Sequence, residues 1–301
     1  MSKNYKESLN KSFNLSMGQK LYELVLPFIQ SSMREEFNIF LIGSDIKNKQ
    51  SLRAKIYNSL ENNQNFNIFF PELIFEEQIF QQYHDLLTLE NLLAESVDAV
   101  VMCVESPGSF TELGAFSNHE QLKNKLVVYL NSKYKKDKSF INLGPAKFLK
   151  KHTNSKVIHI NPDEEFDIYK KKKLMQAIKS IKNQGSLLRY NLSNPLFAEK
   201  FLLALLYVFE NLNKYEITEV FNHINSNSSL NNTDKGIPTS CLSILSQRGE
   251  LIYNSNKKQY TLSAKGRIKL TEEYSNKFIH GKLDNIRVRV LNFKLRKLKM
   301  V

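Results

Sequence analysis

Two carboxylates near the middle of the chain have a spacing that suits chemistry on a glycosidic bond. Residues 105–116 read ESPGSFTELGAF, so Glu105 and Glu112 flank a turn-forming Pro107–Gly108 pair. An ionised carboxylate can attack, or stabilise, the positive charge that develops on a sugar carbon when its base leaves, and a second group can transfer a proton. The stretch therefore predicts N-glycosidic cleavage, with Glu112, Glu105 and Ser109 as catalytic residues.

A structural explanation of Glu112 stays open at this stage. Ser109 and Glu112 have the spacing of a capping box, in which Ser109 caps a helix and Glu112 folds back onto the cap amide. The location favours catalysis, because the stretch follows an apolar run and ligands of open α/β sheets bind at the carboxyl ends of strands. The first amides of the helix, around Ser106 and Gly108, are expected to hold an anionic oxygen or a phosphate.

Other strand ends supply further candidates for substrate binding. Gly43, Ser44 and Asp45 end the first apolar run, where a backbone turn can approach a ribose or a phosphate. Glu72 ends the second and can bind ribose hydroxyls. An ordinary turn capped by Asp45, and a surface position for Glu72, are the competing interpretations. No HExxH, Walker or GxGxxG motif occurs, so no metal and no cofactor are expected.

The elements that must position these residues alternate between apolar strands and helices. Strands that are apolar throughout indicate a parallel sheet covered on both faces, and hence a flavodoxin- or Rossmann-like α/β domain over residues 1–190. Residues 75–86 are expected to be an insertion, and 133–151 a lysine-rich loop-plus-helix excursion. The predicted strands are 37–43, 65–72, 99–105, 125–131 and 156–161, and the predicted helices are 17–34, 51–63, 88–98 and 167–186.

Residues 191–301 have a mainly helical pattern, unlike the alternation of strands and helices before them. Predicted helices at 195–212, 216–226 and 237–251 precede two short strands around Ser255-Asn256-Lys257, and a closing helix and a basic tail follow. This order, with the pattern Leu-x-x-x-Gly-x-Leu-Ile and Tyr-x-Leu-x-x-x-Gly between Leu245 and Gly266, predicts a winged helix-turn-helix domain.

Charge separates the two halves of the chain. Residues 1–130 carry 11 Lys/Arg against 16 Asp/Glu, whereas residues 131–301 carry 32 against 14. Such asymmetry suggests that one part handles a small molecule and the other a polyanion, although a solvated lysine-rich surface is the alternative. Binding of a protein by the winged helix also stays open. The predicted nucleic-acid-binding residues are Arg248, Lys257, Lys258, Lys265, Arg267, Arg287 and Arg289.

The remaining composition points to a reducing compartment. Cys103 and Cys241 lie far apart, which fits neither a disulfide framework nor a CxxC metal pair. The first 20 residues are too polar for a signal peptide, and no apolar run is long enough to span a bilayer. We expect a cytoplasmic protein that does not use a membrane.

The stretch 106–118 resembles the nucleoside deoxyribosyltransferase superfamily, whose nucleophilic glutamate begins a Glu-Leu-Gly helix and here matches Glu112. It is more similar still to the deoxyribosyltransferase-like effectors of bacterial retrons, a similarity that extends to 87–101, 139–145 and the basic C-terminal part. The resemblance implies an antiphage toxin that hydrolyses the N-glycosidic bond of NAD⁺, as a substrate, or of a related nucleotide. It also implies control by a retron reverse transcriptase and its branched RNA–DNA (msDNA), in an oligomeric complex.

Two alternatives belong to other classes of protein. In a nucleotide-sensing winged-helix DNA-binding regulator, the α/β domain would bind its ligand without cleaving it, and Glu112 would only cap its helix. A lysine-decarboxylase-like phosphoribohydrolase has the signature Pro-Gly-Gly-x-Gly-Thr-x-x-Glu. Residues 107–112 lack two of its glycines and place Glu112 too close to Thr111, so they fit that signature poorly.

Overall fold

The computed structural model describes residues 3–61, 65–70, 96–184, 190–226 and 236–298. The chain divides into two compact units. Arg34–Leu188 form what we call the α/β unit, and Met1–Met33 with Arg189–Val301 form the helical unit. The first 33 residues therefore group with the C-terminal part of the chain, whereas the sequence analysis assigned them to the α/β domain.

The α/β unit contains one parallel sheet with the strand order β2-β1-β3-β4-β5. This confirms the predicted flavodoxin- or Rossmann-like fold. The central strand β3 is buried along its whole length, and its Val101 lies opposite Leu41 on one side and Val127 on the other. The strands are β1 (Phe37–Ile42), β2 (Phe66–Phe69), β3 (Ala99–Cys103), β4 (Leu126–Asn131) and β5 (Lys156–Ile160).

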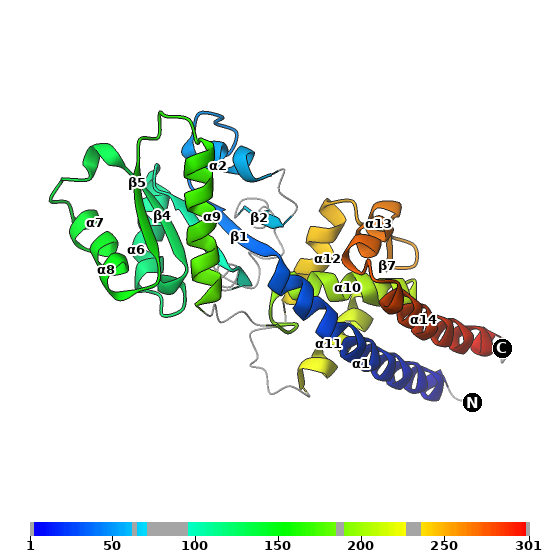
Figure 1. Ribbon diagram of the computed structural model, residues 1–301. Coiled ribbons are helices and arrows are strands. Elements are labelled where there is room, and N and C mark those ends of the chain that lie inside the picture. The colour runs from blue at the N-terminus through cyan, green and yellow to red at the C-terminus, as the bar shows by residue number, and fades with distance from the viewer. Residues whose placement is uncertain (1–2, 62–64, 71–95, 185–189, 227–235, 299–301) are drawn as a thin grey trace. The chain divides into compact units, whose positions relative to one another are not determined.

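Helices cover both faces of this sheet. Helices α2 (Leu52–Leu60) and α9 (Ile168–Asn183) pack on one face and α6 (Pro107–Asn118) and α8 (Pro145–His152) on the other (Figure 1). The apolar side chains of β1, β3 and β4 fill the space under α2 and α9. Three short helical turns complete the described part of the unit: η1 (Leu122–Asn124), η2 (Ser132–Tyr134) and α7 (Phe140–Leu143). The predicted insertion at 75–86 and nearly all of the predicted helix at 88–98 lie outside the described residues.

The helical unit is built around α10 (Pro195–Phe209), nearly all of which is buried. Helix α1 (Lys3–Glu35) contributes a stripe at i, i+4 spacing, with Leu21, Val25 and Ile29 buried. Helices α12 (Ile237–Gln247), α13 (Ala264–Glu273) and α14 (Lys277–Leu298) and strand β7 (Gln259–Leu262) pack against α10. Helix α11 (Lys214–Ser226) packs on α12, and its Phe221 contacts Phe201 of α10. Strand β6 (Leu251–Asn254) forms an antiparallel hairpin with β7.

Two glycines explain the motif that predicted the hairpin. Gly249 has φ of 71° and ends α12, a conformation that a side chain disfavours. A Cβ on Gly266 would lie 2.1 Å from the carbonyl oxygen of Glu250, so α13 can approach the start of β6 only without one. The predicted order of helices and strands is present.

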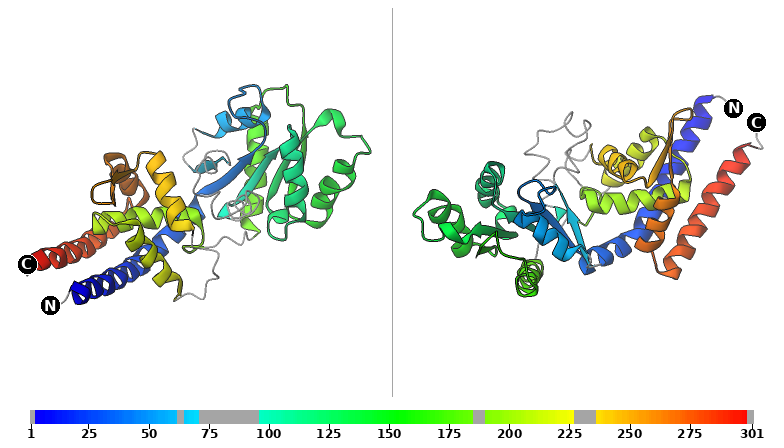
Figure 2. Two further views of the ribbon diagram at one scale, coloured as in Figure 1. Left: turned by 180° about the vertical axis from the view of Figure 1, so that it is seen from behind. Right: turned by 90° about the horizontal axis from the view of Figure 1, so that it is seen from above.

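The predicted basic tail is instead helical. Residues 286–298 belong to α14, which packs on α10 through the buried Leu283 and Val290. Figure 2 shows α1 and α14 as neighbouring helices, and Phe13 stacks on Phe293 with ring centroids 3.7 Å apart. The six basic residues of 286–300 obscured the apolar spacing that makes this segment a helix.

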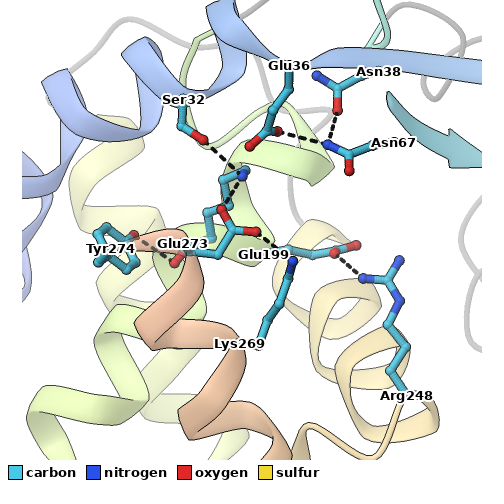
Figure 3. Close-up of polar contacts among 10 residues, drawn as sticks. Ser32, Glu36, Asn38, Asn67, Glu199, Arg248, Lys269, Glu273 and Tyr274 are labelled. Atoms are coloured by element: carbon cyan, nitrogen blue, oxygen red, sulfur yellow. Dashed lines mark hydrogen bonds and ion pairs between the residues drawn. The ribbon is translucent and has the colours of Figure 1, made fainter. Parts of the chain in front are cut away.

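Ion pairs link the helices of this unit. The Lys200 amine is paired with the Glu273 carboxylate, and both side chains are only 11% exposed. Glu273 also contacts Lys269 at 3.0 Å, and Arg248 donates to Glu199 at 2.8 Å (Figure 3). Burial alone would raise the pKa of Glu273, but Lys200 and Lys269 outweigh it, so the pKa lies below its usual value. No described helix is long and apolar enough to cross a bilayer.

Candidate active site

A cavity of about 770 Å³ opens at the carboxyl edge of the parallel sheet, where the sequence predicted ligand binding. Residues that end or follow β1, β3, β4 and β5 line it. Its lining includes Ser44 and Glu105 on one side and Tyr129, Asn131, Asn142 and Asp163 on the other strand ends and loops. The four strand ends thus contribute to one hollow.

Glu105 is the predicted catalytic residue that lies in this cavity. Its two carboxylate oxygens accept hydrogen bonds from the Ser44 hydroxyl and from the backbone amide of Leu52, both at 2.8 Å. Leu52 is the first residue of α2, so the carboxylate caps a helix terminus whose amides have no partner within the helix. The sites predicted separately at Ser44 and at Glu105 therefore meet in one arrangement, and the carboxylate is held in a fixed orientation.

The turn after β1 is shaped by packing. A Cβ on Gly43 would lie 2.9 Å from the Cβ of Cys103 and 3.2 Å from that of Arg53, so the ends of β1 and β3 approach closely there. The guanidinium of Arg53, which is fully buried, donates to the Ser44 carbonyl at 3.0 Å. Asp45 is exposed, and its carboxylate accepts from the Lys47 amide at 2.9 Å. The cap of α2 is Ser51 rather than Asp45.

The capping box proposed for Ser109 and Glu112 is wrong. Helix α6 begins at Pro107, its N-cap is Ser106, and the box is formed by Ser106 with Ser109. Ser109 is 1% exposed, and its hydroxyl donates to the Ser106 carbonyl and accepts from the Glu105 amide. These bonds favour a positioning role for Ser109 over proton transfer.

The start of α6 also offers fewer amides to an anion than predicted. Pro107 has no amide hydrogen, and the Ser109 amide donates to the Ser106 hydroxyl. Gly108 is exposed, and Ser106 is half-buried. The turn is therefore held mainly by its own side chains.

Glu112 lies in the second turn of α6, not in the first as the sequence analysis assumed. It is half-buried beside Leu113, which belongs to the buried face of the helix. Phe110 lines the cavity, whereas Glu112 is not among its described lining residues. At about 100° per residue, the two side chains leave α6 roughly 160° apart. The role of Glu112 stays a prediction.

Sequence reasoning missed the far wall of the cavity. Tyr129 and Asn131 come from β4 and Asp163 follows β5, so the strand-end rule would have found Asn131 and Asp163 had it been applied to all five strands. Burial raises the pKa of the Tyr129 phenol. Asn142 donates to the carbonyls of Tyr134 and Asp137 at 2.7 and 2.9 Å and so shapes this wall. The predicted Glu72 lies outside the described residues.

The described lining is acidic. It includes Glu105, Asp137 and Asp163 and contains no lysine, arginine or histidine. Within the described ranges, no group of three or more His, Cys, Asp or Glu side chains could hold a metal ion. The cavity is thus suited to an uncharged or cationic group.

The predicted nucleic-acid-binding residues fall into two groups. Arg248 pairs with Glu199, and Arg287 pairs with Glu210 at 2.8 Å while lying over the Tyr207 ring. These two guanidinium groups are engaged within the helical unit. The other five residues are exposed on the hairpin and on the helices that follow it: Lys257, Lys258, Lys265, Arg267 and Arg289.

Comparison with known proteins places the chain among retron proteins. Residues 49–253 match the family model described as "STM3845 retron effector protein". An Escherichia coli protein named "Retron Ec86 putative ribosyltransferase/DNA-binding protein" is 33% identical over 303 aligned positions, which cover 96% of this chain and 95% of that protein. A second Escherichia coli protein, "Retron Ec73 putative ribosyltransferase/DNA-binding protein", is 36% identical over 115 residues, about a third of each chain.

Proposed function

The chain belongs to the STM3845 retron effector protein family, and from this premise we propose that it is an N-glycosidase that hydrolyses NAD⁺ or a related nucleotide. The observation that carries the proposal is the Glu105 carboxylate, fixed by Ser44 and the first amide of α2 in a cavity at the ligand edge of the sheet. The relative named a ribosyltransferase supports the same class of chemistry.

The acidic lining supports NAD⁺ as the substrate. The nicotinamide ring of NAD⁺ is cationic, so the carboxylates of Glu105, Asp137 and Asp163 attract it, whereas they repel the diphosphate. The cavity therefore takes the nicotinamide–ribose end, and the diphosphate remains outside the described lining. A base that leaves as neutral nicotinamide needs no proton donor, because it carries away the electron pair of the broken bond.

We assign the nucleophile to Glu112, on the resemblance of 106–118 to the deoxyribosyltransferases. A Glu112 carboxylate oxygen bonds to the ribose carbon as the bond to nicotinamide breaks, and water then hydrolyses the resulting ester. We assign to Glu105 the role of accepting the proton of that water.

We further propose that the helical unit is a winged helix that binds the msDNA of a retron, and that the reverse transcriptase and this RNA–DNA hold the enzyme inactive in a cytoplasmic, oligomeric complex. The hairpin β6–β7 after α12 and the five exposed basic residues support this assignment. Phosphate contacts from such side chains position a nucleic acid with little reading of its sequence.

The sensing alternative is favoured by one observation, the absence of Glu112 from the described lining of the cavity. A binding pocket that only senses a nucleotide needs no nucleophile. An N-glycosidase should therefore lose its activity in Glu112→Gln, whereas a nucleotide sensor should bind its ligand unchanged in this variant.

The test is release of nicotinamide from NAD⁺ by the purified full-length chain, followed by chromatography. We expect Glu112→Gln to reduce turnover by at least about 10³-fold and Glu105→Gln by about 10²–10⁴-fold, with no change in the cooperative unfolding transition. Glu120→Gln, an exposed carboxylate just after α6, is the matched control. Recovery of intact NAD⁺ from wild-type protein that binds it would favour the sensor, and full activity of Glu112→Gln would remove that residue from the mechanism.

A further inference from the structure

The segment 132–152, here called the lysine-aromatic segment, combines clustered lysines with several exposed aromatic rings. It contains seven lysines and one acidic residue, Asp137. Tyr134 is 54% exposed, Phe140 82% and Phe148 40%, so three aromatic rings face solvent. Exposed apolar groups that gather in one region, in contrast to singly scattered ones, often mark an interaction site. The lysines are Lys133, Lys135, Lys136, Lys138, Lys147, Lys150 and Lys151, all exposed.

The segment is folded, and its rings are presented by a fixed backbone. Ser139 caps α7, and the Asn142 amide closes the loop onto the carbonyls of Tyr134 and Asp137. A Cβ on Gly144 would lie 2.8 Å from the Phe140 carbonyl oxygen, so the corner between α7 and α8 is tight. The buried Ala146 and Leu149 attach α8 to the rest of the unit. Little backbone freedom is lost when such a surface binds a ligand.

The positive charges of the segment are not neutralised internally. None of the seven lysines forms an ion pair with a carboxylate within the described parts of the chain. Lys133 lies over the Tyr134 ring, with its amine 5.7 Å from the ring centre. Burial lowers the pKa of His159, and Lys150 and Lys135 lower it further, so amines from both ends of the segment act on one imidazole. The segment is therefore a compact region of positive potential.

We propose that the lysine-aromatic segment is a second nucleic-acid-binding surface, on the α/β unit, and that it takes a single strand. Lysines contact the phosphates, and the exposed faces of Tyr134 and Phe140 stack on unpaired bases. A duplex can use the lysines but not the rings, because its bases are already stacked. The acidic face of a protein would likewise satisfy only the charges.

The surface adjoins the candidate active site. Tyr134, Asp137 and Asn142 belong to the segment and also line the cavity. A strand stacked on Tyr134 therefore lies at the edge of the cavity, so binding of the strand and of a nucleotide compete for space. The binding surface itself does not depend on whether the cavity cleaves its ligand.

The first test compares two labelled probes, a 20-nucleotide thymidine strand and a 20-base-pair duplex, by fluorescence anisotropy with the full-length chain. We expect Tyr134→Ala with Phe140→Ala to weaken the single strand by at least tenfold and the duplex by less than twofold. Tyr169→Ala is the control, since Tyr169 is 75% exposed and precedes a run of four lysines. An unchanged affinity for the strand, an equal loss for the duplex or an equal effect of Tyr169→Ala would overturn the proposal.

A second test places the contact directly. A 20-nucleotide strand with a central 5-iodouracil is crosslinked to the full-length wild-type chain, and the modified peptide is identified by mass spectrometry. Crosslinks at Tyr134, Phe140 or Phe148 support the proposal. Crosslinks confined to the helical unit contradict it. Binding of a polyglutamate peptide in preference to the strand, lost in Lys135→Gln with Lys136→Gln, would assign the segment to a protein partner instead.

Discussion

The α/β unit and the helical unit use charge in different ways. Residues 34–188 carry 21 Lys/Arg and 19 Asp/Glu, nearly a balance, yet the signs are separated: carboxylates line the cavity and lysines cover the segment 132–152. Residues 1–33 and 189–301 together carry 22 Lys/Arg and 11 Asp/Glu. Several of these basic side chains form ion pairs within the helical unit. The net charge of a region is therefore a weaker guide to function than the placement of its charges.

The largest expected effect is on stability, and it tests whether the ion pairs within the helical unit stabilise the fold. Lys200→Met removes one of the two lysines that pair with Glu273, and Lys269 remains as a partner. Breaking a buried pair outright costs about 3–5 kcal/mol, so we expect a loss toward the lower end of that range. Chemical denaturation should show this loss in the free energy of unfolding. Lys214→Met, at an exposed lysine of α11, should change it by less than about 0.5 kcal/mol. If the two variants were equally stable, the ion pair of Lys200 with Glu273 would not contribute to the stability of the fold.

A smaller effect separates the exposed from the paired basic residues. Lys257→Gln with Lys258→Gln at the hairpin should lower the slope of log affinity against log salt for a DNA duplex by about 0.9 per residue, which weakens binding several-fold at physiological salt. Arg287→Met removes a group that is already paired with Glu210 and should leave the slope nearly unchanged. If the slope falls as much in Arg287→Met as in the hairpin variant, the ion pair with Glu210 does not keep Arg287 from binding DNA.

The smallest effect concerns pH. Burial raises the pKa of Glu250, whose Oε2 has no hydrogen-bond partner in the part of the chain that the structure describes. Because the folded pKa lies above the unfolded value of about 4.3, the stability linked to this group is full below that value and is lost as pH rises through the folded pKa.

Glu273 should change the stability with pH in the opposite direction, since its pKa in the folded protein is lowered. The stability linked to it is full above the unfolded pKa and is lost as pH falls through the folded pKa. Glu250→Gln should therefore gain stability relative to wild type as pH rises from 4 to 7, and Glu273→Gln should lose it. The measurement is thermal unfolding of both variants and of wild type across this pH range. If stability relative to wild type changes with pH in the same direction in both variants, the opposite pKa shifts of Glu250 and Glu273 are refuted.

The sheet could be predicted from the sequence because its strands are short, mainly apolar runs that alternate with helical segments. The start of α6 was instead assigned to Ser109 in place of Ser106, since two serines three residues apart both fit a cap. Pro107 was the deciding signal, because proline is favoured at the first position of a helix. Similarly, the carboxylate of Glu105 was predicted from its strand end, but its partner Leu52 contributes a backbone amide, which no residue type reveals.

Helix α1 has a consequence for how the molecule is made. The Tyr22 ring of α1 contacts the rings of Phe197 and Phe201, and residues 1–33 group with residues 189–301, so the sequence of the α/β unit is inserted between two parts of the helical unit. All five strands of the parallel sheet are translated before Phe197 and Phe201, although α1 is made first. The buried stripe of α1 therefore cannot reach its packing position beside α10 until the whole of the α/β unit has been synthesised.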